Sequence, residues 1–344
     1  MTIKDLSKKL HVSTATISRA LNPATAQLVN PALRHRIATY AEKHRFVPNQ
    51  AARNLVMGRS HTLGIILYSA FGSLFFSDYL SKIQWGISEA LNEHHGYGSR
   101  IAILPRGKSL RDMDQEAIGN GVDGLLISTI CDFTLERLQE VAYSMERRWN
   151  KPIVALNIGT LKNSQINTVS FSNRDAMYQG VLRLIQKGHE HIGLIHTDDG
   201  STDVADRLEG FNAALADHRL SFHAGFASVG NFTPASGYQA TIELFKRPKS
   251  QILTALVCTN DEMAFGAIQA LKGLHKKVPQ EIAVMGFDGL AMGEHLSPRL
   301  STVAQPFFEM AKEGTHLLLN LIEGRVKGPV HLTIPSQLVP RDSD

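Results

Sequence analysis

Small polar residues and one arginine follow one another near the start of the chain. Residues 14–19 read Thr-Ala-Thr-Ile-Ser-Arg. The guanidinium of Arg19 can donate two hydrogen bonds to O6 and N7 of guanine. Small and hydroxyl-bearing neighbours would let a helix approach the major groove of DNA closely. We therefore expect a base-reading surface made of Thr14, Ala15, Thr16, Ser18 and Arg19.

A second group of polar residues stands at the ends of short apolar runs. Asn157, Asn260 and Asp288 each occupy such a position. Asn and Asp side chains accept hydrogen bonds from hydroxyl groups such as those of a sugar. If the apolar runs are parallel strands, their carboxyl ends meet at one edge of a sheet, where small ligands bind. The ring of Phe307 is a candidate to stack on an apolar face of such a ligand.

Short helices are expected to position the first group. Thr2 and Ser13 are N-cap candidates for two short amphipathic helices separated by about three residues, and this pattern predicts a helix-turn-helix. Asn30 followed by Pro31 predicts a third helix, which runs to about residue 44. Asn49 can cap a fourth, short segment that would be marginal as an isolated helix. We interpret this segment as a hinge that becomes ordered when it binds.

The rest of the chain alternates short apolar runs with amphipathic segments. The expected strands cover residues 63–67, 101–104, 124–127, 153–158, 168–171, 191–196, 226–229, 255–258 and 282–286, with a strand-like tail at 331–339. The expected helices cover 79–94, 111–120, 135–148, 174–187, 205–218, 235–246, 261–274 and 307–322. This alternation predicts parallel sheets covered by helices on both faces. Asp261 is expected to cap the helix that follows it.

Positive charge is concentrated at the beginning of the chain. The protein has 344 residues and a net charge of +4, but residues 1–59 hold ten Lys and Arg against two acidic residues, a net charge of +8. The remaining residues carry a net charge of −4. A basic head on a mildly acidic body indicates a polyanionic partner for the head.

Three segments of the head resemble the LacI/GalR family of bacterial transcription regulators. They are Thr-Ile-Lys-Asp-Leu-Ser at 2–7, Val-Ser-Thr-Ala-Thr-Ile-Ser-Arg-Ala-Leu-Asn at 12–22 and Val-Pro-Asn-Gln-Ala-Ala-Arg-Asn-Leu at 47–55. The resemblance implies that Ser13 to Asn22 form the recognition helix. It also implies that residues 49–57 form a hinge helix in the minor groove, where Asn49 and Ala52 accompany a wedge, Leu55. Two such leucines from a dimer would unstack a central base step of the operator.

His11 stands in the turn where members of this family usually have Gly. Histidine tolerates a left-handed backbone better than most residues, so we expect the turn to be kept.

The body resembles the same family, whose effector domain is similar to periplasmic sugar-binding proteins. The matching segments include Gly-Val-Asp-Gly-Leu-Leu-Ile from 121, Arg-Leu-Glu-Gly-Phe from 207 and Thr-Asn-Asp-Glu-Met-Ala-Phe-Gly-Ala from 259. The resemblance implies that Arg207 binds the effector. The family usually has Asn-Pro-Phe-Phe after the first strand, but the corresponding stretch is longer here. Phe75, Phe76 and Tyr79 therefore all remain candidates for the aromatic contact.

The predicted fold is an N-terminal all-α helix-turn-helix head with a hinge helix, followed by a two-lobed α/β domain like the periplasmic binding proteins. The expected boundaries are 1–48 for the head, 49–59 for the hinge, 60–171 plus 307–328 for the first lobe, and 172–306 plus 329–344 for the second.

Together these features predict a homodimeric transcription regulator, a repressor that binds a pseudo-palindromic operator. A sugar or sugar derivative bound between the lobes would control its operator affinity. Two alternatives stay open. In one, the body responds mainly to a phosphoprotein partner; in the other, the chain is an enzyme with an accessory DNA-binding head.

The sequence gives little support for an enzyme, a metal- or disulfide-stabilised protein, or a membrane protein. The sequence contains no Gly-x-x-x-x-Gly-Lys-Ser/Thr loop, no His-Glu-x-x-His and no Gly-x-Ser-x-Gly motif, so we expect no enzyme activity, cofactor or metal. Its two cysteines exclude a disulfide framework and a cysteine-rich zinc site. No apolar stretch reaches about 18 residues, so we expect a cytoplasmic protein without membrane segments.

Overall fold

The computed structural model divides the chain into two compact units, Met1–Ser60 and His61–Asp344. The described residues are 1–22, 25–46, 59–69, 78–94, 96–105, 121–128, 151–157, 166–198, 200 and 202–344. The expected helices at 111–120 and 135–148 and the hinge at 49–57 lie outside them. Within these ranges no helix is long and apolar enough to cross a membrane.

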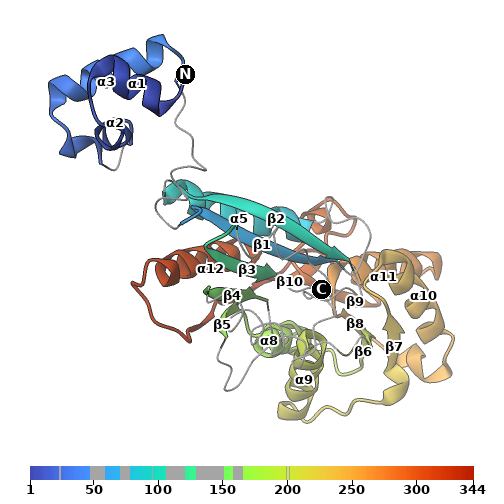
Figure 1. Cartoon of the computed structure of the whole chain (residues 1–344). Helices are drawn as coiled ribbons and strands as arrows, with labels where there is room; N and C mark the ends of the chain where they lie inside the picture. Colours follow the sequence, from blue (N-terminus) through green and yellow to red (C-terminus); the bar gives the residue numbers. More distant parts are fainter. Residues whose placement is uncertain are drawn as a thin grey trace. The chain divides into compact units, whose positions relative to one another are not determined.

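The first unit is a small bundle of helices (Figure 1). It consists of α1 (Ile3–Leu10), α2 (Thr14–Ala20), the 3-10 turn η1 (Ala26–Leu28) and α3 (Pro31–Lys43). The side chains of Thr2, Ser13 and Asn30 cap the three α-helices by accepting hydrogen bonds from backbone amides in the first turn. His11 ends α1 in the left-handed conformation, with a φ of 52°. The expected helix-turn-helix and its caps are therefore present.

A compact apolar core holds these helices together. Leu6, Ile17 and Ile37, one from each α-helix, are fully buried. The guanidinium of Arg36 on α3 donates a hydrogen bond of 3.0 Å to the carbonyl oxygen of Leu10, the last residue of α1. This contact satisfies a helix-terminal carbonyl that has no partner within its own helix.

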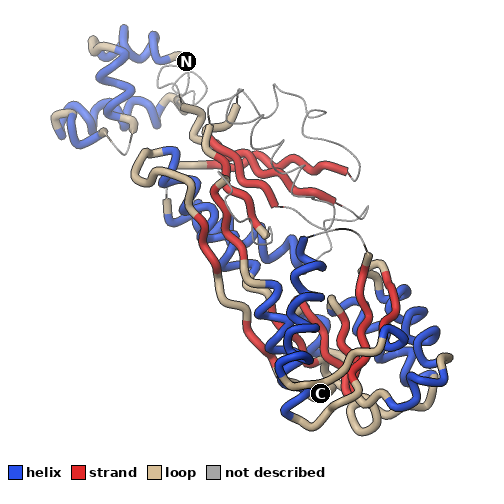
Figure 2. Tube along the Cα trace, turned by 90° about the horizontal axis from the view of Figure 1, so that it is seen from below, coloured by secondary structure: helices blue, strands red, loops and turns tan. Residues whose placement is uncertain are grey.

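The second unit contains two separate sheets, whose strands are red in Figure 2. The first sheet has the order β11-β5-β4-β3-β1-β2. Its strands are β1 (Thr62–Ser69), β2 (Gly98–Pro105), β3 (Gly124–Ser128), β4 (Ile153–Leu156), β5 (Asn167–Ser170) and β11 (His331–Thr333). All of its pairings are parallel. Helices α5 (Asp78–Glu93) and α12 (Phe307–Ile322) pack against each other, and α12 also contacts β3 and β4.

The second sheet has the order β12-β10-β9-β8-β6-β7. Its strands are β6 (Ile192–Thr197), β7 (Ala227–Gly230), β8 (Ala255–Cys258), β9 (Ala283–Asp288), β10 (Ser301–Ala304) and β12 (Gln337–Val339). Only β12 runs antiparallel to its neighbour among the described strands. The helix pair α8 (Asn173–Gln186) and α9 (Thr202–Asp217) and the pair α10 (Pro234–Phe245) and α11 (Asp261–Gly273) lie on either side of this sheet (Figure 1).

Among the described strands, the chain passes between the two sheets three times. It leaves the first sheet after β5, returns to it after β10 and leaves it again between β11 and β12. The expectation that residues 329–344 belong wholly to the second lobe was wrong, because β11 pairs with β5 of the first sheet. The last crossing therefore lies at residues 334–336. The single tail strand expected at 331–339 is two strands in different sheets.

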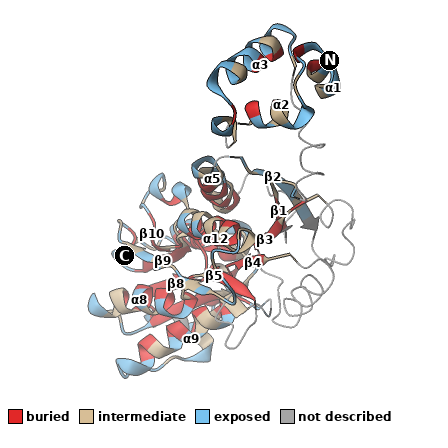
Figure 3. Cartoon of the chain, turned by 60° about the vertical axis from the view of Figure 1, so that its left-hand side comes forward, coloured by how far each residue is buried: buried red, intermediate tan, exposed pale blue. Residues whose placement is uncertain are grey.

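The apolar core runs along the strands and the helix faces that cover them (Figure 3). One continuous cluster extends from Leu63 and Leu126 in the first sheet to Met285 and Val303 in the second. Phe171, at the first crossing, belongs to the same cluster. The first crossing is therefore a packed segment of the core.

Candidate functional site

The helix-turn-helix presents the side chains expected to contact DNA. Thr14, Ala15 and Arg19 of α2 are exposed, whereas Ile17 and Ala20 on its opposite face are buried in the head core. Thr16 and Ser18 are partly exposed. The helix thus has one face fixed by packing and one face available to a major groove.

The ends of α2 are fixed by local hydrogen bonds. Ser13 Oγ accepts a hydrogen bond of 3.1 Å from the amide of Thr16, so its hydroxyl serves as the N-cap. The carbonyl of Asn22 accepts bonds from the amides of Thr25 and Ala26, which turns the chain after the helix. The hinge candidates Asn49, Ala52 and Leu55 lie outside the described residues.

Arg207 is the centre of a buried polar network in the second unit. Its side chain projects from α9 and is only 5% exposed. Nε donates to Asn173 Oδ1 at 2.8 Å, and Nη1 donates to the carbonyl oxygen of Thr259 at 2.6 Å. Nη1 also lies 3.7 Å from Asp288 Oδ1. The guanidinium is thereby held at the carboxyl ends of β8 and β9, where a ligand would bind.

Close packing of two helices brings Arg207 to this place. Gly210 follows it by one turn of α9, at the contact with α8. A Cβ atom on Gly210 would lie 2.1 Å from the carbonyl oxygen of Arg174. Only glycine therefore lets the two helices approach closely enough for Arg207 to reach Asn173 on α8.

Asp288 ends β9 with a strained backbone and a perturbed carboxyl group. Its φ is 130°, a backbone conformation that residues other than glycine rarely adopt. Gln305 Nε2 donates a hydrogen bond to Asp288 Oδ1. Burial raises the pKa of the carboxyl to about 8, although the charge of Arg207 opposes this shift. The carboxyl can thus change its protonation state near neutral pH.

Asp203, which was not predicted from the sequence, joins this network. Its Oδ1 accepts from Asn173 Nδ2 at 3.1 Å, and its Oδ2 accepts from Asn157 Nδ2 at 3.3 Å. Asn157 directly follows β4 of the first sheet and has a φ of 53°, whereas Asp203 lies in the first turn of α9. The expected residue Asn157 is therefore joined to the Arg207 network across the two sheets.

Asn260 is present at the expected strand end, but its amide group already has partners. Its Oδ1 accepts from the amide of Met263 at 3.0 Å, which makes Asn260 the N-cap of α11. Its Nδ2 donates to the carbonyl oxygen of Phe232 at 3.0 Å. Phe232, which was not predicted from the sequence, is an aromatic residue with a φ of 69° two residues after β7. Its unusual backbone conformation is visible only in the structure.

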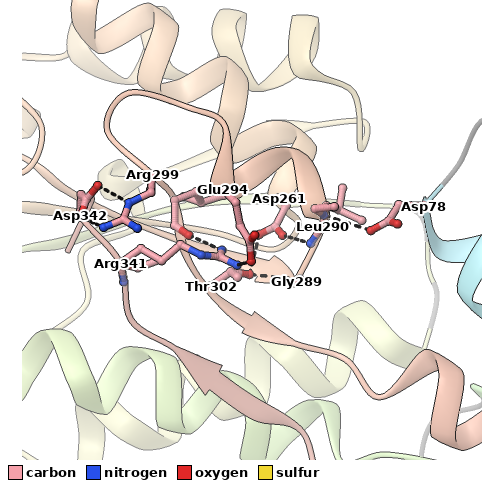
Figure 4. Close-up of polar contacts among 12 residues, drawn as sticks. Asp78, Asp261, Gly289, Leu290, Glu294, Arg299, Thr302, Arg341 and Asp342 are labelled. Atoms are coloured by element: carbon pink, nitrogen blue, oxygen red, sulfur yellow. Dashed lines mark hydrogen bonds and ion pairs between the residues drawn. The ribbon is translucent and has the colours of Figure 1, made fainter.

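The expectation that Asp261 caps α11 was wrong. Because Asn260 is the N-cap, the carboxylate of Asp261 turns toward Thr302 on β10 (Figure 4). Oδ1 accepts from Thr302 Oγ1 at 2.6 Å, and Oδ2 accepts from the amide of Leu290 at 2.7 Å. Burial raises the pKa of Asp261 to about 6 against the opposing effect of these bonds. Asp261 therefore fixes the loop that follows Asp288.

Tyr79 is the aromatic candidate that the structure describes. Its ring packs edge to face with Phe307 at 4.5 Å between centroids, and its hydroxyl lies 2.7 Å from Ser128 Oγ at the end of β3. Phe307 is only 3% exposed, so its ring lies in the core, where it packs against the ring of Tyr79. The other two candidates, Phe75 and Phe76, lie outside the described residues.

Several buried polar atoms at the carboxyl ends of the second sheet have no hydrogen-bond partner within the described part of the chain. They are Thr197 Oγ1, Thr259 Oγ1 and Gln305 Oε1. Buried polar groups are rarely left unpaired, so these atoms indicate a place where a polar ligand binds. The same ranges contain no group of three or more His, Cys, Asp or Glu side chains that could hold a metal ion.

Comparison with known proteins agrees with both parts of this description. Residues 2–49 match the model of bacterial regulatory proteins of the lacI family, and residues 181–343 match the periplasmic binding protein-like domain. The chain is 30% identical over 323 residues to the probable HTH-type transcriptional repressor ExuR of Bacillus subtilis strain 168, covering 94% of this chain and 92% of that protein. The chain belongs to the LacI family. It is accordingly a DNA-binding transcriptional regulator and not an enzyme.

Other members of the LacI family are similar over the whole chain. The repressor CytR of Escherichia coli K12 is 29% identical over 349 residues, which cover 99% of this chain and 96% of CytR. A structure of the regulator CelR in complex with cellobiose has a TM-score of 0.72 and 26% identity, with full coverage of both chains. The lac repressor dimer bound to operator and the anti-inducer ONPF has a TM-score of 0.81 and 25% identity, covering 100% and 98%.

Proposed function

We propose that this regulator is a repressor that binds a pseudo-palindromic operator as a homodimer, and that a sugar bound at the carboxyl ends of the strands changes its operator affinity. The observation that supports the effector part of this proposal is the buried network of Arg207, Asp288 and Asp203. It gathers a cation, two carboxyl groups and several amides at one edge of the sheets. Sugar hydroxyls both donate and accept hydrogen bonds, so such a mixed set suits them.

Two further features support a sugar as the ligand. The unpartnered oxygens of Thr197, Thr259 and Gln305 would complete their hydrogen bonds with hydroxyl groups. The ring of Tyr79 can cover the apolar face of a pyranose. The structurally similar regulator CelR was solved with cellobiose, which agrees with this choice of ligand.

The DNA-binding half rests on α2. Its exposed face, with Thr14, Ala15 and Arg19, would enter the major groove, and Asn49, Ala52 and Leu55 would contact the centre of the operator. A two-fold symmetric dimer binds two half-sites, and the similar lac repressor was solved as a dimer on its operator. Because the partner is the chromosome, we place the protein in the cytoplasm.

A sugar would act by shifting a conformational equilibrium. A ligand that binds two arrangements of the lobes unequally changes their populations by its differential affinity. The arrangement that positions both heads for the two half-sites would then gain or lose population, and operator affinity would follow.

A thermal-shift screen of the full chain against sugars, sugar phosphates and nucleobases tests the proposal. A sugar at about 100 times its dissociation constant stabilises the domain that binds it by about 2.7 kcal/mol. The melting temperature should rise by a few degrees, and the same sugar should change the binding of a DNA duplex selected from a random library.

A matched pair of variants locates the site. Arg207→Lys should abolish the shift, because lysine cannot reproduce the two directed hydrogen bonds to Asn173 and Thr259. Arg174→Lys should keep it, because Arg174 lies on the surface of α8. A flat screen with a cooperative unfolding transition would contradict a sugar effector and would favour a protein partner instead.

A further inference from the structure

The loop that presents Asp288 is held from both lobes. It consists of residues 288–291, from the last residue of β9 to the first residue of the short helix η5 (Ala291–Glu294) of the second lobe. Two side chains of the first lobe contact it. Lys82 Nζ donates a hydrogen bond of 2.9 Å to the carbonyl oxygen of Gly289, and Asp78 Oδ2 accepts one of 3.1 Å from the amide of Ala291. Asp78 and Lys82 lie one turn apart on α5 and form an ion pair of 3.1 Å. We call these two side chains the α5 clamp.

The second lobe fixes the same loop from the other side (Figure 4). The carboxylate of Asp261 accepts from the amide of Leu290 and from Thr302 Oγ1, and Thr302 Oγ1 accepts from the amide of Gly289 at 3.3 Å. Asp261 fits there because residue 286 is glycine; a Cβ on Gly286 would lie 2.1 Å from Asp261 Oδ1. Three consecutive backbone units of the loop are therefore held by polar contacts.

The backbone is strained at Asp288, directly before these contacts, because its φ is 130°. Gly289 follows with a φ of 75°, which glycine adopts without strain. A strained conformation persists only where its surroundings determine it firmly, and such strain is common at ligand clamps and switch regions. The contacts of Asp261, Asp78 and Lys82 are the surroundings that hold this conformation.

We propose that Asp78 and Lys82 are positioning residues that couple the place of Asp288 to the arrangement of the two lobes. The inference rests on the proposed function in one respect, namely that Asp288 contacts the effector. If α5 moves away from the second lobe, the loop loses its contacts at Gly289 and Ala291 together. Conversely, a ligand that draws Asp288 out of its strained conformation disturbs both contacts with α5.

Hydrogen–deuterium exchange of the full-length protein tests the clamp without any ligand. Asp78→Ala and Lys82→Met should each make the peptide that contains residues 289–296 exchange about fivefold faster, the effect of losing one ordinary hydrogen bond. Asp78→Asn keeps an acceptor for the amide of Ala291 and should restore slow exchange at that amide. Lys312→Met is the matched control, because Lys312 pairs with Glu93 on the same helix α5 but within the first lobe.

A distance measurement between the lobes provides the second readout. Spin labels at Asn92→Cys on α5 and Gln239→Cys on α10 occupy exposed positions, in a Cys131→Ser background in which Cys258 stays buried. Asp78→Ala should broaden the distance distribution, and Lys312→Met should leave it unchanged. Unchanged exchange and distances in Asp78→Ala, or an equal change in Lys312→Met, would overturn the proposal. Neither readout uses sugar or DNA, so failure here is distinct from failure of the sugar-effector proposal.

Discussion

Arg207 stacks its guanidinium on the ring of Phe287, with Cζ 4.1 Å from the ring centroid. The ring is fully buried and covers one face of the guanidinium, which also donates hydrogen bonds to Asn173 and to the carbonyl oxygen of Thr259. A buried cation–π contact of this kind contributes about 2 kcal/mol. The orientation of Arg207 therefore depends on an apolar residue as well as on its polar partners.

Phe287→Leu should destabilise the effector domain by about 1–3 kcal/mol, because the cation–π contact is lost and a small cavity forms. It should also weaken sugar binding, because the guanidinium of Arg207 would no longer be held in one orientation by the ring. Urea unfolding and calorimetric titration measure the two effects. Phe265→Leu, which removes a buried ring from α11, should lower stability without a matching loss of sugar affinity. Equal losses of sugar affinity in the two variants would show that the stack does not orient Arg207.

Arg19→Ala should lower affinity for a selected operator by about 1–3 kcal/mol, the value of one bidentate contact with a base. Binding to a scrambled duplex should fall much less. Arg34→Ala removes the same charge from an exposed position on α3 of the head and should weaken both duplexes alike. Fluorescence anisotropy at two salt concentrations separates the cases. If Arg19→Ala lost equal affinity for both duplexes, Arg19 would contact phosphate and not a base.

Stability should fall as pH rises from about 4 toward 8, through the contribution of Asp288. Its folded-state pKa, raised to about 8 by burial, exceeds the unfolded value, so folding binds a proton across this range. Asp288→Asn removes that proton linkage and should flatten the slope between pH 5 and pH 8 in urea unfolding. Asp342→Asn is the control. Arg299 lowers the pKa of Asp342, so this carboxyl is ionised in both states throughout that range. An unchanged slope in Asp288→Asn would show that Asp288 is ionised at pH 5.

Leu6→Ala should unfold the head and leave the effector domain intact. Leu6 is fully buried in a small core, and a cavity there costs about 2–5 kcal/mol, a large share of the stability of so small a unit. Operator binding should be lost while the sugar-induced thermal shift persists, because the chain forms two compact units. Leu28→Ala, at a residue 73% exposed, should change neither property. Loss of the sugar response in Leu6→Ala would contradict this independence.

Elements whose signals are local could be predicted from the sequence. Thr2, Ser13 and Asn30 are caps because an N-cap depends on a few neighbouring residues. The short strand β10 was missed, because Ser-Thr-Val-Ala is mostly polar and small, and its burial comes from pairing with β9 and β12. The late crossing after β11 was misplaced for the same reason, since it depends on pairing with the distant strand β5.

The site was predicted in part. Arg207 and Asp288 come together, although their spacing in the sequence gives no sign of it. Asp203 was missed because an acidic residue in the first turn of a helix is common, and its contacts with Asn157 and Asn173 exist only in three dimensions. Asp261 was misinterpreted because two adjacent residues could cap α11, and only packing against Thr302 decides which one does.

The three crossings between the sheets also limit how the lobes can move. β5 lies beside β11 in the first sheet and β10 beside β12 in the second, so the three connecting segments leave from neighbouring strands. One connection would act as a swivel, whereas three adjacent ones resist twisting and sliding and leave bending as the soft degree of freedom. Ligand binding at the strand ends would then change mainly the bending angle between the lobes. Chemically different ligands would therefore produce the same motion with different amplitudes.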